Sequence, residues 1–317
     1  MARVKEKSMS SDTATKSEDI RTTNQHPWTE RARYFNSGNA FALQLPPVPS
    51  VQFTAERDEA FAEDTPTSLI DMNLSDALDT PYPATTPLVL SRYARIRADE
   101  SLRVRVQASA QFFCVLRGSG STTIGSESVT WSAGDVLALP GAPEVIHAAS
   151  EDTVAWLVTD EPALAFQELA PLSVEDSSMQ PVHYPAEALD AELEGVYNHP
   201  DAETFPGYAV VLSHANLEHW RNVHQTMTLA LNSLPPDSSQ RPHVHNSMAL
   251  TLCLAGEDCY SMIDGERKDW QQHAVMLTPP AAAHSHHNAG DGRMRCLIVQ
   301  DGGLYYHART IGFAYAD

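Results

Sequence analysis

The sequence contains no long hydrophobic run. No stretch approaches the roughly 18 consecutive apolar residues of a membrane helix, so we expect no membrane partner. The first residues, MARVKEKSMSSDTATKSED, have no apolar segment of the kind that a secretory signal needs. Cysteine is scarce, and the four cysteines show no CxxC spacing. These absences predict a cytoplasmic protein with reduced, mostly buried thiols.

Basic residues are also few. Lys and Arg number 21 against 41 Asp and Glu, which gives a formal net charge of −20. Such an acidic chain argues against nucleic acid or an anionic membrane surface as its partner, because both need positive charge. The chain also lacks a GxGxxG motif after a strand, a P-loop, GxSxG and HExxH. Nucleotide binding and serine hydrolysis are therefore not indicated.

The remaining sequence predicts an all-β protein with a few short helices. Short apolar segments alternate with Gly, Asp or Pro turns beyond residue 90, which favours a sandwich or barrel. We divide the chain into a disordered tail (1–25), an N-terminal arm (26–90), a first β module (91–165), a polar linker with a helix near PAEALDAELEGVY (166–205) and a second β module (206–317).

An internal repeat supports the two modules. FFCVLRGSGSTTIGSESVTWSAGDVLALPG aligns with LTLCLAGEDCYSMIDGERKDWQQHAVMLTPP, with one residue of slippage in a turn. The alignment matches Gly118 with Gly256, Trp131 with Trp270, and Pro140 with Pro279. The three matches occur in the same order in both segments, with the same alternation of strands and turns, which indicates a duplication.

Histidines gather in the second module only. In RPHVHNSMALTLCLAG, His243 and His245 are two residues apart, so both point to the same face of a strand. The segment PPAAAHSHHNAG follows a later strand and offers His284, His286 or His287 as a third ligand. In the first module, the aligned residues are Arg105, Gln107 and Val145, and only His147 is kept, as the match of His286. We therefore expect a metal in the second module and none in the first.

These motifs resemble those of the cupin superfamily. RPHVHNSMALTLCLAG is similar to its first motif and TPPAAAHSHHN to its second, and the whole resembles a bicupin. RPHVHNS, MIDGERKDW and the late VQD resemble gentisate 1,2-dioxygenases and their relatives acting on salicylate or 1-hydroxy-2-naphthoate. The resemblance implies two double-stranded β-helix (jelly-roll) modules and an Fe(II) held by His243, His245 and His284. It further implies ring cleavage of a hydroxylated aromatic acid with O2, a role in aromatic catabolism, and a homo-oligomer.

Two departures from the family pattern concern the pocket. Ala249 stands where cupins usually carry a Glu, and small residues (AAAH) precede His284 where aromatic residues are usual. Three neutral ligands leave a divalent ion its full charge, which favours an anionic chelating substrate. Around the ion we assign catalytic roles to His286 and Arg241, and substrate contacts to Arg241, Gln225, Ala249, Arg295 and Gln300.

Imidazole also suits Zn, Mn or Ni, so the ligands alone do not fix the metal. Two alternatives stay open at this point. One is a redox-neutral isomerase or lyase that uses Zn, Mn or Ni as a Lewis acid. The other is a cupin that binds a small molecule without catalysis.

Overall fold

The computed structural model describes residues 28–205 and 207–316, so the tail predicted over 1–25 lies outside the described residues. Residues Met1–Gln44 and Leu45–Asp317 form separate units. The described part of the first unit holds two short helices, α1 (Trp28–Arg31) and α2 (Ser37–Ala40). The Asn36 side chain accepts a hydrogen bond from the Gly38 amide at 2.9 Å, which caps α2.

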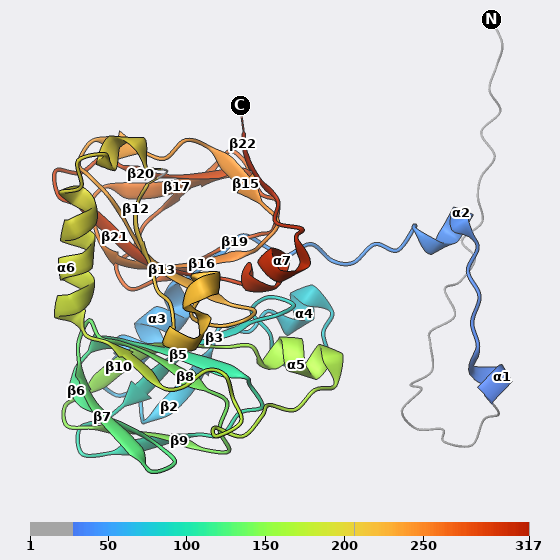
Figure 1. Ribbon diagram of the computed structural model, residues 1–317, viewed down its shortest axis with the longest axis horizontal. Coiled ribbons are helices and arrows are strands. Elements are labelled where there is room, and N and C mark those ends of the chain that lie inside the picture. Colours follow the sequence, from blue (N-terminus) through green and yellow to red (C-terminus); the bar gives the residue numbers. More distant parts are fainter. Residues whose placement is uncertain (1–27, 206, 317) are drawn as a thin grey trace, which may run out of the picture. The chain divides into compact units, whose positions relative to one another are not determined.

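Two barrels of antiparallel strands form the second unit (Figure 1). The first barrel uses β2 (Ser68–Asp71), β3 (Leu90–Ile96), β4 (Ser101–Val104), β5 (Ala110–Arg117), β6 (Ser119–Ile124), β7 (Glu127–Ser132), β8 (Val136–Pro140), β9 (Val145–Ala149), β10 (Thr153–Thr159) and β11 (Val182–Tyr184). A six-stranded sheet of order β11-β8-β5-β10-β3-β2 faces a four-stranded sheet of order β4-β9-β6-β7.

The second barrel repeats this plan. Its strands are β1 (Val51–Phe53), β12 (Tyr208–Val211), β13 (Thr228–Leu234), β14 (Ser238–Ser239), β15 (His243–His245), β16 (Ala249–Ala255), β17 (Cys259–Ile263), β18 (Glu266–Asp269), β19 (Val275–Thr278), β20 (His284–Asn288), β21 (Met294–Gln300) and β22 (Phe313–Tyr315). One sheet has the order β1-β19-β16-β21-β13-β12, and the other β18-β17-β20-β15-β22 with β14 also pairing with β20.

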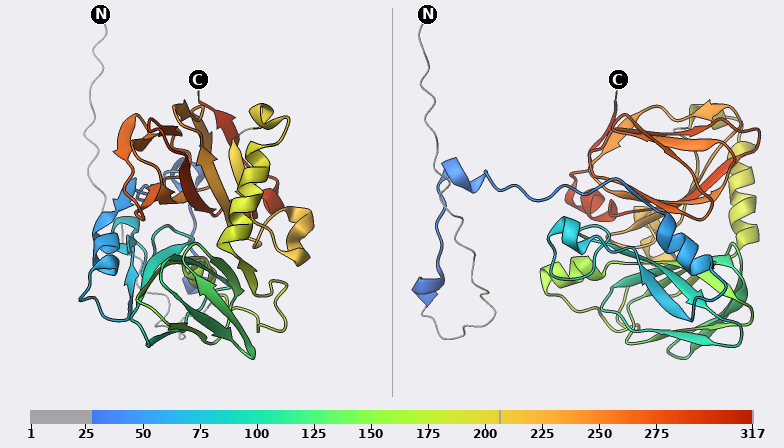
Figure 2. Two further views of the ribbon diagram at one scale, coloured as in Figure 1. Left: turned by 90° about the vertical axis from the view of Figure 1, so that its left-hand side faces the viewer. Right: turned by 180° about the vertical axis from the view of Figure 1, so that it is seen from behind.

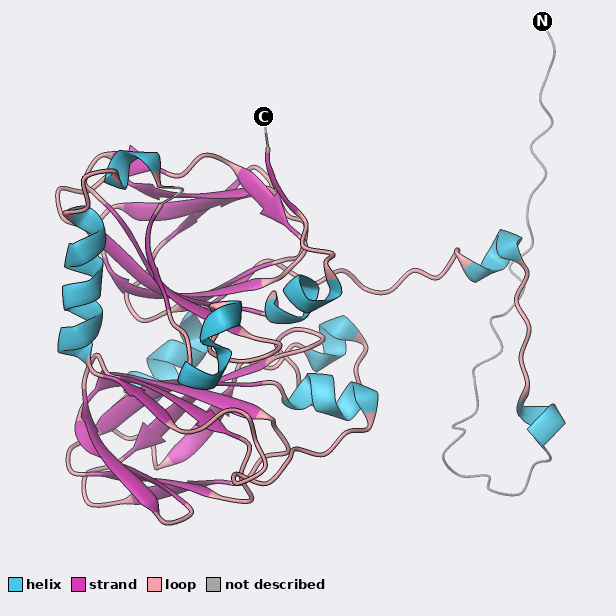
Figure 3. Cartoon of the chain, viewed as in Figure 1, coloured by secondary structure: helices cyan, strands magenta, loops and turns pink. Residues whose placement is uncertain are grey.

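Short helices connect and flank the barrels (Figure 3). They are α3 (Thr54–Phe61), α4 (Ser75–Leu78), α5 (Glu161–Gln167), α6 (Ala186–Tyr197) and α7 (Gly303–Ala308), with the 3-10 helices η2 (Ala202–Thr204) and η3 (Ala215–Trp220). Seen from behind in Figure 2, α3 lies where the two barrels meet, and its Arg57 donates to the Gln272 carbonyl at 2.6 Å. The predicted all-β fold with a few short helices is confirmed.

The two six-stranded sheets pack face to face. Because side chains alternate along a strand, β5 directs Phe112 and Cys114 into the core between the barrels and Phe113 into the interior of its own barrel. In the same way, Leu250 and Leu252 of β16 join the core between the barrels. The inward face of β16 is thereby left to smaller side chains, and this face borders the histidines.

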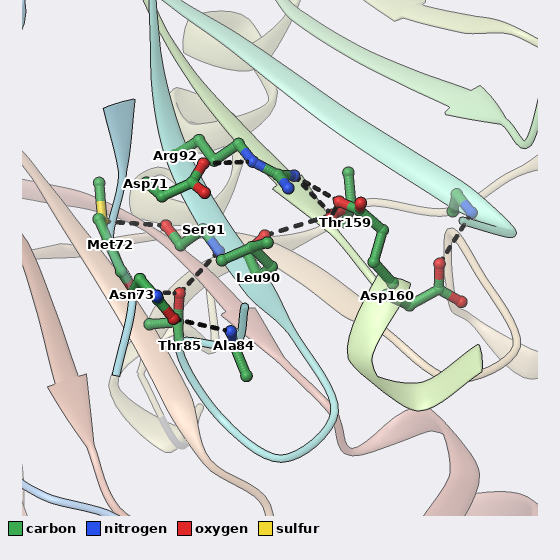
Figure 4. Close-up of polar contacts among 12 residues, drawn as sticks. Asp71, Met72, Asn73, Ala84, Thr85, Leu90, Ser91, Arg92, Thr159 and Asp160 are labelled. Carbon is green, nitrogen blue, oxygen red and sulfur yellow. Dashed lines mark hydrogen bonds and ion pairs between the residues drawn. The ribbon is translucent and has the colours of Figure 1, made fainter. Parts of the chain in front are cut away.

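Polar contacts connect β3 with its neighbours β2 and β10 in the first barrel (Figure 4). Arg92 is buried and its Nε donates to Asp71 Oδ1 at 2.7 Å, while its Nη1 pairs with Thr159 and Glu161. A buried guanidinium is tolerated here because both of its neighbouring carboxylates accept hydrogen bonds from it.

The element boundaries differ from the sequence divisions at two points. Residues 51–53 and 68–71, expected in an irregular arm, are strands that pair with β19 and β3. Residues 182–184, expected in the linker, pair with β8. Both barrels thus contain strands from outside the repeated segments. These strands pair with backbone N–H and C=O groups that would otherwise be unpaired at the sheet edges.

Candidate metal centre

Three histidines converge on two neighbouring strands of the second barrel. β15 carries His243 and His245, and β20 carries His284, which lies opposite His243 in the antiparallel pair. One possible ligand nitrogen from each residue lies within 4.8 Å of those of the other two. The ring centroid of His284 is 4.3 Å from that of His243 and 4.6 Å from that of His245. Among the described residues, no other group of three or more His, Cys, Asp or Glu comes together in this way.

Hydrogen bonds define the tautomer of each ring. The Nδ1 atoms of His243, His245 and His284 lie 3.0, 2.7 and 2.9 Å from backbone carbonyl oxygens two residues away along the chain. A carbonyl only accepts, so each Nδ1 carries the hydrogen and donates it. The lone pair of each neutral ring then lies on Nε2, where a metal would bind.

Burial keeps two of these rings neutral. It lowers the pKa of His284 to about 3 and lowers that of His245 as well. Ligation requires neutral imidazole, so at least these two rings need no deprotonation near pH 7. Three facial nitrogens fit a divalent first-row metal ion, and the donor set is one that Fe, Zn, Cu and Ni all accept.

A cavity of about 280 Å³ opens beside the histidines. Of the residues assigned from the sequence, His286, Ala249 and Gln300 line it. Gln300 Nε2 lies 3.1 Å from His245 Nε2, so this amide borders the coordination position. The remaining lining residues come from β12, β13, β21, α7, β22 and nearby loops: Ala209, Val211, Thr228, Ala230, Asn232, Gln240, Asn246, Ser247, Ile298, Gly302, Tyr306, Ile311 and Phe313.

Sequence reasoning missed most of this second group. Gln240 comes three residues before His243, and that closeness could have identified it. Tyr306 and Phe313 lie far along the chain from both histidine motifs, and no local pattern marks them. Phe313 reaches the cavity because β22 pairs with β15, and Tyr306 reaches it from α7.

Three of the assigned residues lie elsewhere. The Arg241 guanidinium stacks over the Tyr315 ring, 4.2 Å from its centroid. Arg295 pairs with Asp190 of α6 and borders a different cavity. Gln225 donates to Ser178 and lines a third cavity, beside η3 and α7. The structure therefore does not bring these side chains to the lining of the metal cavity.

His286 lies beside the metal set and has a different hydrogen-bond pattern. Trp270 Nε1 donates to Ser261 Oγ at 2.9 Å, and Ser261 Oγ lies 2.7 Å from His286 Nδ1. Among the described contacts, His286 Nδ1 is the one acceptor for the Ser261 hydroxyl hydrogen, which places the ring hydrogen on Nε2. Burial lowers the pKa of His286 to about 3, so this ring is a neutral donor near pH 7.

The first barrel repeats this arrangement without the ligands. Trp131 Nε1 donates to Thr122 Oγ1 at 2.8 Å, and Thr122 Oγ1 lies 2.7 Å from His147 Nδ1, which supports the aligned repeat. Strand pairing changes one match of the predicted repeat. Val104 pairs with Val145 as His243 pairs with His284, so Val104, and not Arg105, corresponds to His243. Two valines, which cannot bind a metal, thus occupy those positions.

Aromatic packing also fills the interior of the first barrel. Phe113 stacks on the His147 ring with centroids 4.0 Å apart. Phe113 pairs with Leu137, three residues before Pro140, and Thr251 pairs with Met276, three residues before Pro279. A phenyl ring in one barrel therefore corresponds to a small hydroxyl side chain in the other.

Comparison with known proteins agrees with this architecture. Residues 230–300 match the family model described as Cupin domain. A salicylate 1,2-dioxygenase from Pseudaminobacter salicylatoxidans superposes with a TM-score of 0.71 at 14% identity, covering 86% of this chain and 89% of that chain. Its adduct with gentisate gives 0.69 at 12% identity, covering 86% of each chain. A cupin 2 conserved barrel domain protein from Leptotrichia buccalis gives 0.51 at 12% identity, covering 81% and 98%.

Within the second barrel, residues 230–300 are therefore similar to a cupin domain, and the chain as a whole has the two-barrel cupin fold. The predicted resemblance to bicupins is confirmed at the level of the fold. None of the curated proteins compared with the chain matches it. Across the described residues, every helix is too short or too polar to span a bilayer.

Proposed function

We propose that this chain is a mononuclear non-haem Fe(II)-dependent dioxygenase that cleaves a hydroxylated aromatic acid or a similar chelating substrate with O2. The observation that carries the proposal is the convergence of one ligand nitrogen from each of His243, His245 and His284 beside a cavity that all three line. The fold shared with salicylate 1,2-dioxygenase supports it.

The donor set favours this chemistry. Three neutral ligands leave the ion its +2 charge, so an anionic chelate is stabilised when it binds. When bound, Fe(II) would supply a Lewis acid that gathers substrate and O2 and passes electron density between them. A cavity of about 280 Å³ accommodates a single substituted ring, since an apolar cavity of about 150 Å³ takes up benzene.

The surrounding residues orient the reactants. The Ser247 carbonyl accepts from His245 Nδ1 at 2.7 Å and holds that ring in place. Gln300 presents its amide next to the coordination position. His286 holds its proton at Nε2 and lines the cavity, where it can donate a hydrogen bond to a bound oxygen atom. Ala249 leaves space where a carboxylate would otherwise compete for the metal.

The cavity offers less to a redox-neutral isomerase or lyase. No Asp or Glu is found among its described lining residues, so a reaction that needs a carboxylate base has none there. Asp301 follows Gln300, but its Oδ1 accepts a hydrogen bond from the Met248 amide at 2.9 Å.

Oxygen consumption tests the proposal. Protein loaded with Fe(II) under anaerobic conditions should take up O2 when gentisate, salicylate or a hydroxynaphthoate is added, and Zn(II)-loaded protein should not. His284→Ala should abolish uptake, whereas His287→Ala should keep it, because the His287 ring stacks on Tyr260. Absence of uptake with every hydroxylated aromatic acid, in protein shown to contain iron, would contradict the proposal.

A further inference from the structure

A second cavity, with a volume of about 420 Å³, lies between η3 and α7 and contains none of the metal-site histidines in its lining. We propose that this cavity binds a small neutral aromatic molecule whose polar edge both donates and accepts a hydrogen bond, as a carboxamide or a lactam does. The site is separate from the metal cavity, so the proposal does not depend on the reaction that the metal centre performs.

α7 contributes to the walls of both cavities. Tyr306 lines the metal cavity, whereas Leu304 lines the second cavity. Two residues along an α-helix are about 200° apart around its axis, which explains why these side chains serve different cavities. The Gly303 amide donates to the Thr226 carbonyl at 3.0 Å, and a Cβ on Gly303 would lie 2.7 Å from the Gln225 carbonyl oxygen. Glycine thus allows the start of α7 to pack closely against the segment that lines the cavity beside it.

Asn222 provides the observation that points to a ligand. It lines the cavity and is 8% exposed. Its backbone carbonyl accepts from the His214 amide at 3.3 Å and from the Ser213 hydroxyl at 3.2 Å, which fixes its position. Its side-chain amide makes no hydrogen bond to any residue that the structure describes, and the amide atoms remain accessible. Buried amides are normally paired, so this donor and this acceptor are positions for a ligand.

The neighbouring polar groups are already used within the protein. The Thr226 amide donates to His224 Nδ1 at 3.4 Å, which places the ring hydrogen on Nε2, 3.2 Å from Ser109 Oγ. Ser109 Oγ in turn donates to the Asp160 carboxylate. Asp160 thus lies behind the cavity wall, where its negative charge disfavours an anionic ligand.

The lining itself is uncharged, because the described residues that form it include no Asp, Glu, Lys or Arg. An ion that entered the cavity would lose its hydration without gaining a partner of opposite charge, which is unfavourable for either sign. A neutral molecule avoids this cost. The cavity therefore selects against the anionic acids that the metal cavity is proposed to bind.

Apolar side chains surround the free amide. Leu217 is buried, whereas Trp220 and Leu304 are 44% and 43% exposed, and the Trp220 and His307 ring centroids are 5.9 Å apart. A bound ring would cover the exposed indole and leucine side chains and so remove apolar surface from water. The volume exceeds the roughly 150 Å³ of a cavity that takes up benzene, so it has room for a ring with a substituent.

Three probes of nearly the same shape test the charge and the polar edge of the ligand. Benzamide is neutral, benzoate is an anion and benzamidinium is a cation. Each is titrated by calorimetry into the purified chain near pH 8. Benzamide should bind in the millimolar range or more tightly, and at least about tenfold more tightly than either ion, because neither charge finds a partner in the lining.

Variants assign the binding to this cavity. Asn222→Leu should weaken benzamide binding at least about fivefold, the effect of one hydrogen bond. Trp220→Ala should weaken it about threefold, through loss of the ring contact. Asn198→Leu, at the exposed C-cap of α6, is the matched control and should bind benzamide as the parent does. His243→Ala should also leave benzamide binding unchanged, because the metal cavity is a different site.

Thermal unfolding separates a ligand contact from a structural one. The Asn222 amide has no described partner, so Asn222→Leu should not lower the unfolding temperature. A lowered unfolding temperature would assign the amide a structural role and overturn the proposal. Absence of benzamide binding, benzamide binding that Asn222→Leu leaves unchanged, or tighter Asn222-dependent binding of either ion would overturn it as well.

Light scattering tests the other possible occupant, a second copy of this chain. If Leu304→Asp converts an oligomer of the parent chain into a smaller species and benzamide does not bind, the cavity is a contact between copies and the proposal is overturned. None of these results bears on the dioxygenase proposal, which is tested by metal content and O2 consumption.

Discussion

Asp301 provides a test of the structure around the site through the pH dependence of stability. This carboxyl is buried, at 5% exposure, and its Oδ1 accepts a hydrogen bond from the Met248 amide. Burial raises its pKa from the ordinary 3.8 to about 7. A folded protein that binds this proton more tightly than the unfolded chain loses stability as the pH rises from about 4 to about 7.

The size of the penalty follows from the shift. A difference of about 3 pKa units corresponds to roughly 4 kcal/mol above pH 7. Asp301→Asn removes the penalty, because asparagine keeps an acceptor for Met248 and presents a donor where the protonated acid has one. The variant should therefore unfold at a temperature on the order of 10 °C higher than the parent at pH 8. The difference should shrink toward zero near pH 4.

Thermal unfolding measured from pH 4 to pH 9 provides the comparison. Asp291→Asn, at an exposed position before β21, serves as the control and should change stability by less than about 0.5 kcal/mol at any pH. A raised pKa of Asp301 is contradicted if Asp301→Asn is no more stable than the parent at pH 8, or if the difference between them does not depend on pH.

Three further substitutions test the comparison of the two barrels. Phe113→Ala should cost about 3–5 kcal/mol in denaturant unfolding, as a large core truncation, without changing metal content; a cost under about 1 kcal/mol would contradict the packing of this ring. Ser261→Ala leaves Trp270 Nε1 and His286 Nδ1 without their partner, so it should lower the free energy of unfolding by about 1–3 kcal/mol in the same assay. Unchanged stability would contradict these two hydrogen bonds. Thr251→Phe places in the second barrel the side chain that fills the first; it should keep the bound metal and lose calorimetric binding of salicylate, and undiminished binding would show that this side chain does not border the substrate space.

Much of the fold could be predicted because its signals are local. Strand alternation, turn residues and the spacing of Trp131 and Trp270 identify two related β modules. The two-residue spacing of His243 and His245 fixes their common face whatever the partner strand is. The strands at 51–53 and 68–71 carried no comparable signal, because they are short edge strands whose pairing is decided by the sheets they join.

The cavity was harder to predict for a physical reason. Its wall is assembled from several segments, and only strand pairing brings Phe313 of β22 beside His245. Arg241 precedes the ligands by two residues, and its position suggested a substrate contact. The Tyr315 ring instead lies under its guanidinium, an interaction with a residue that no local pattern connects to it. Side chains that meet through tertiary contacts need the fold before they can be placed.

Whether His243, His245 and His284 hold a metal can be measured by metal analysis of anaerobically purified protein. We expect a single divalent ion per chain in the parent protein and in His287→Ala, and loss of that ion in His284→Ala. Retention of a full complement of metal by His284→Ala, or equal loss from His287→Ala, would contradict a site built from His243, His245 and His284.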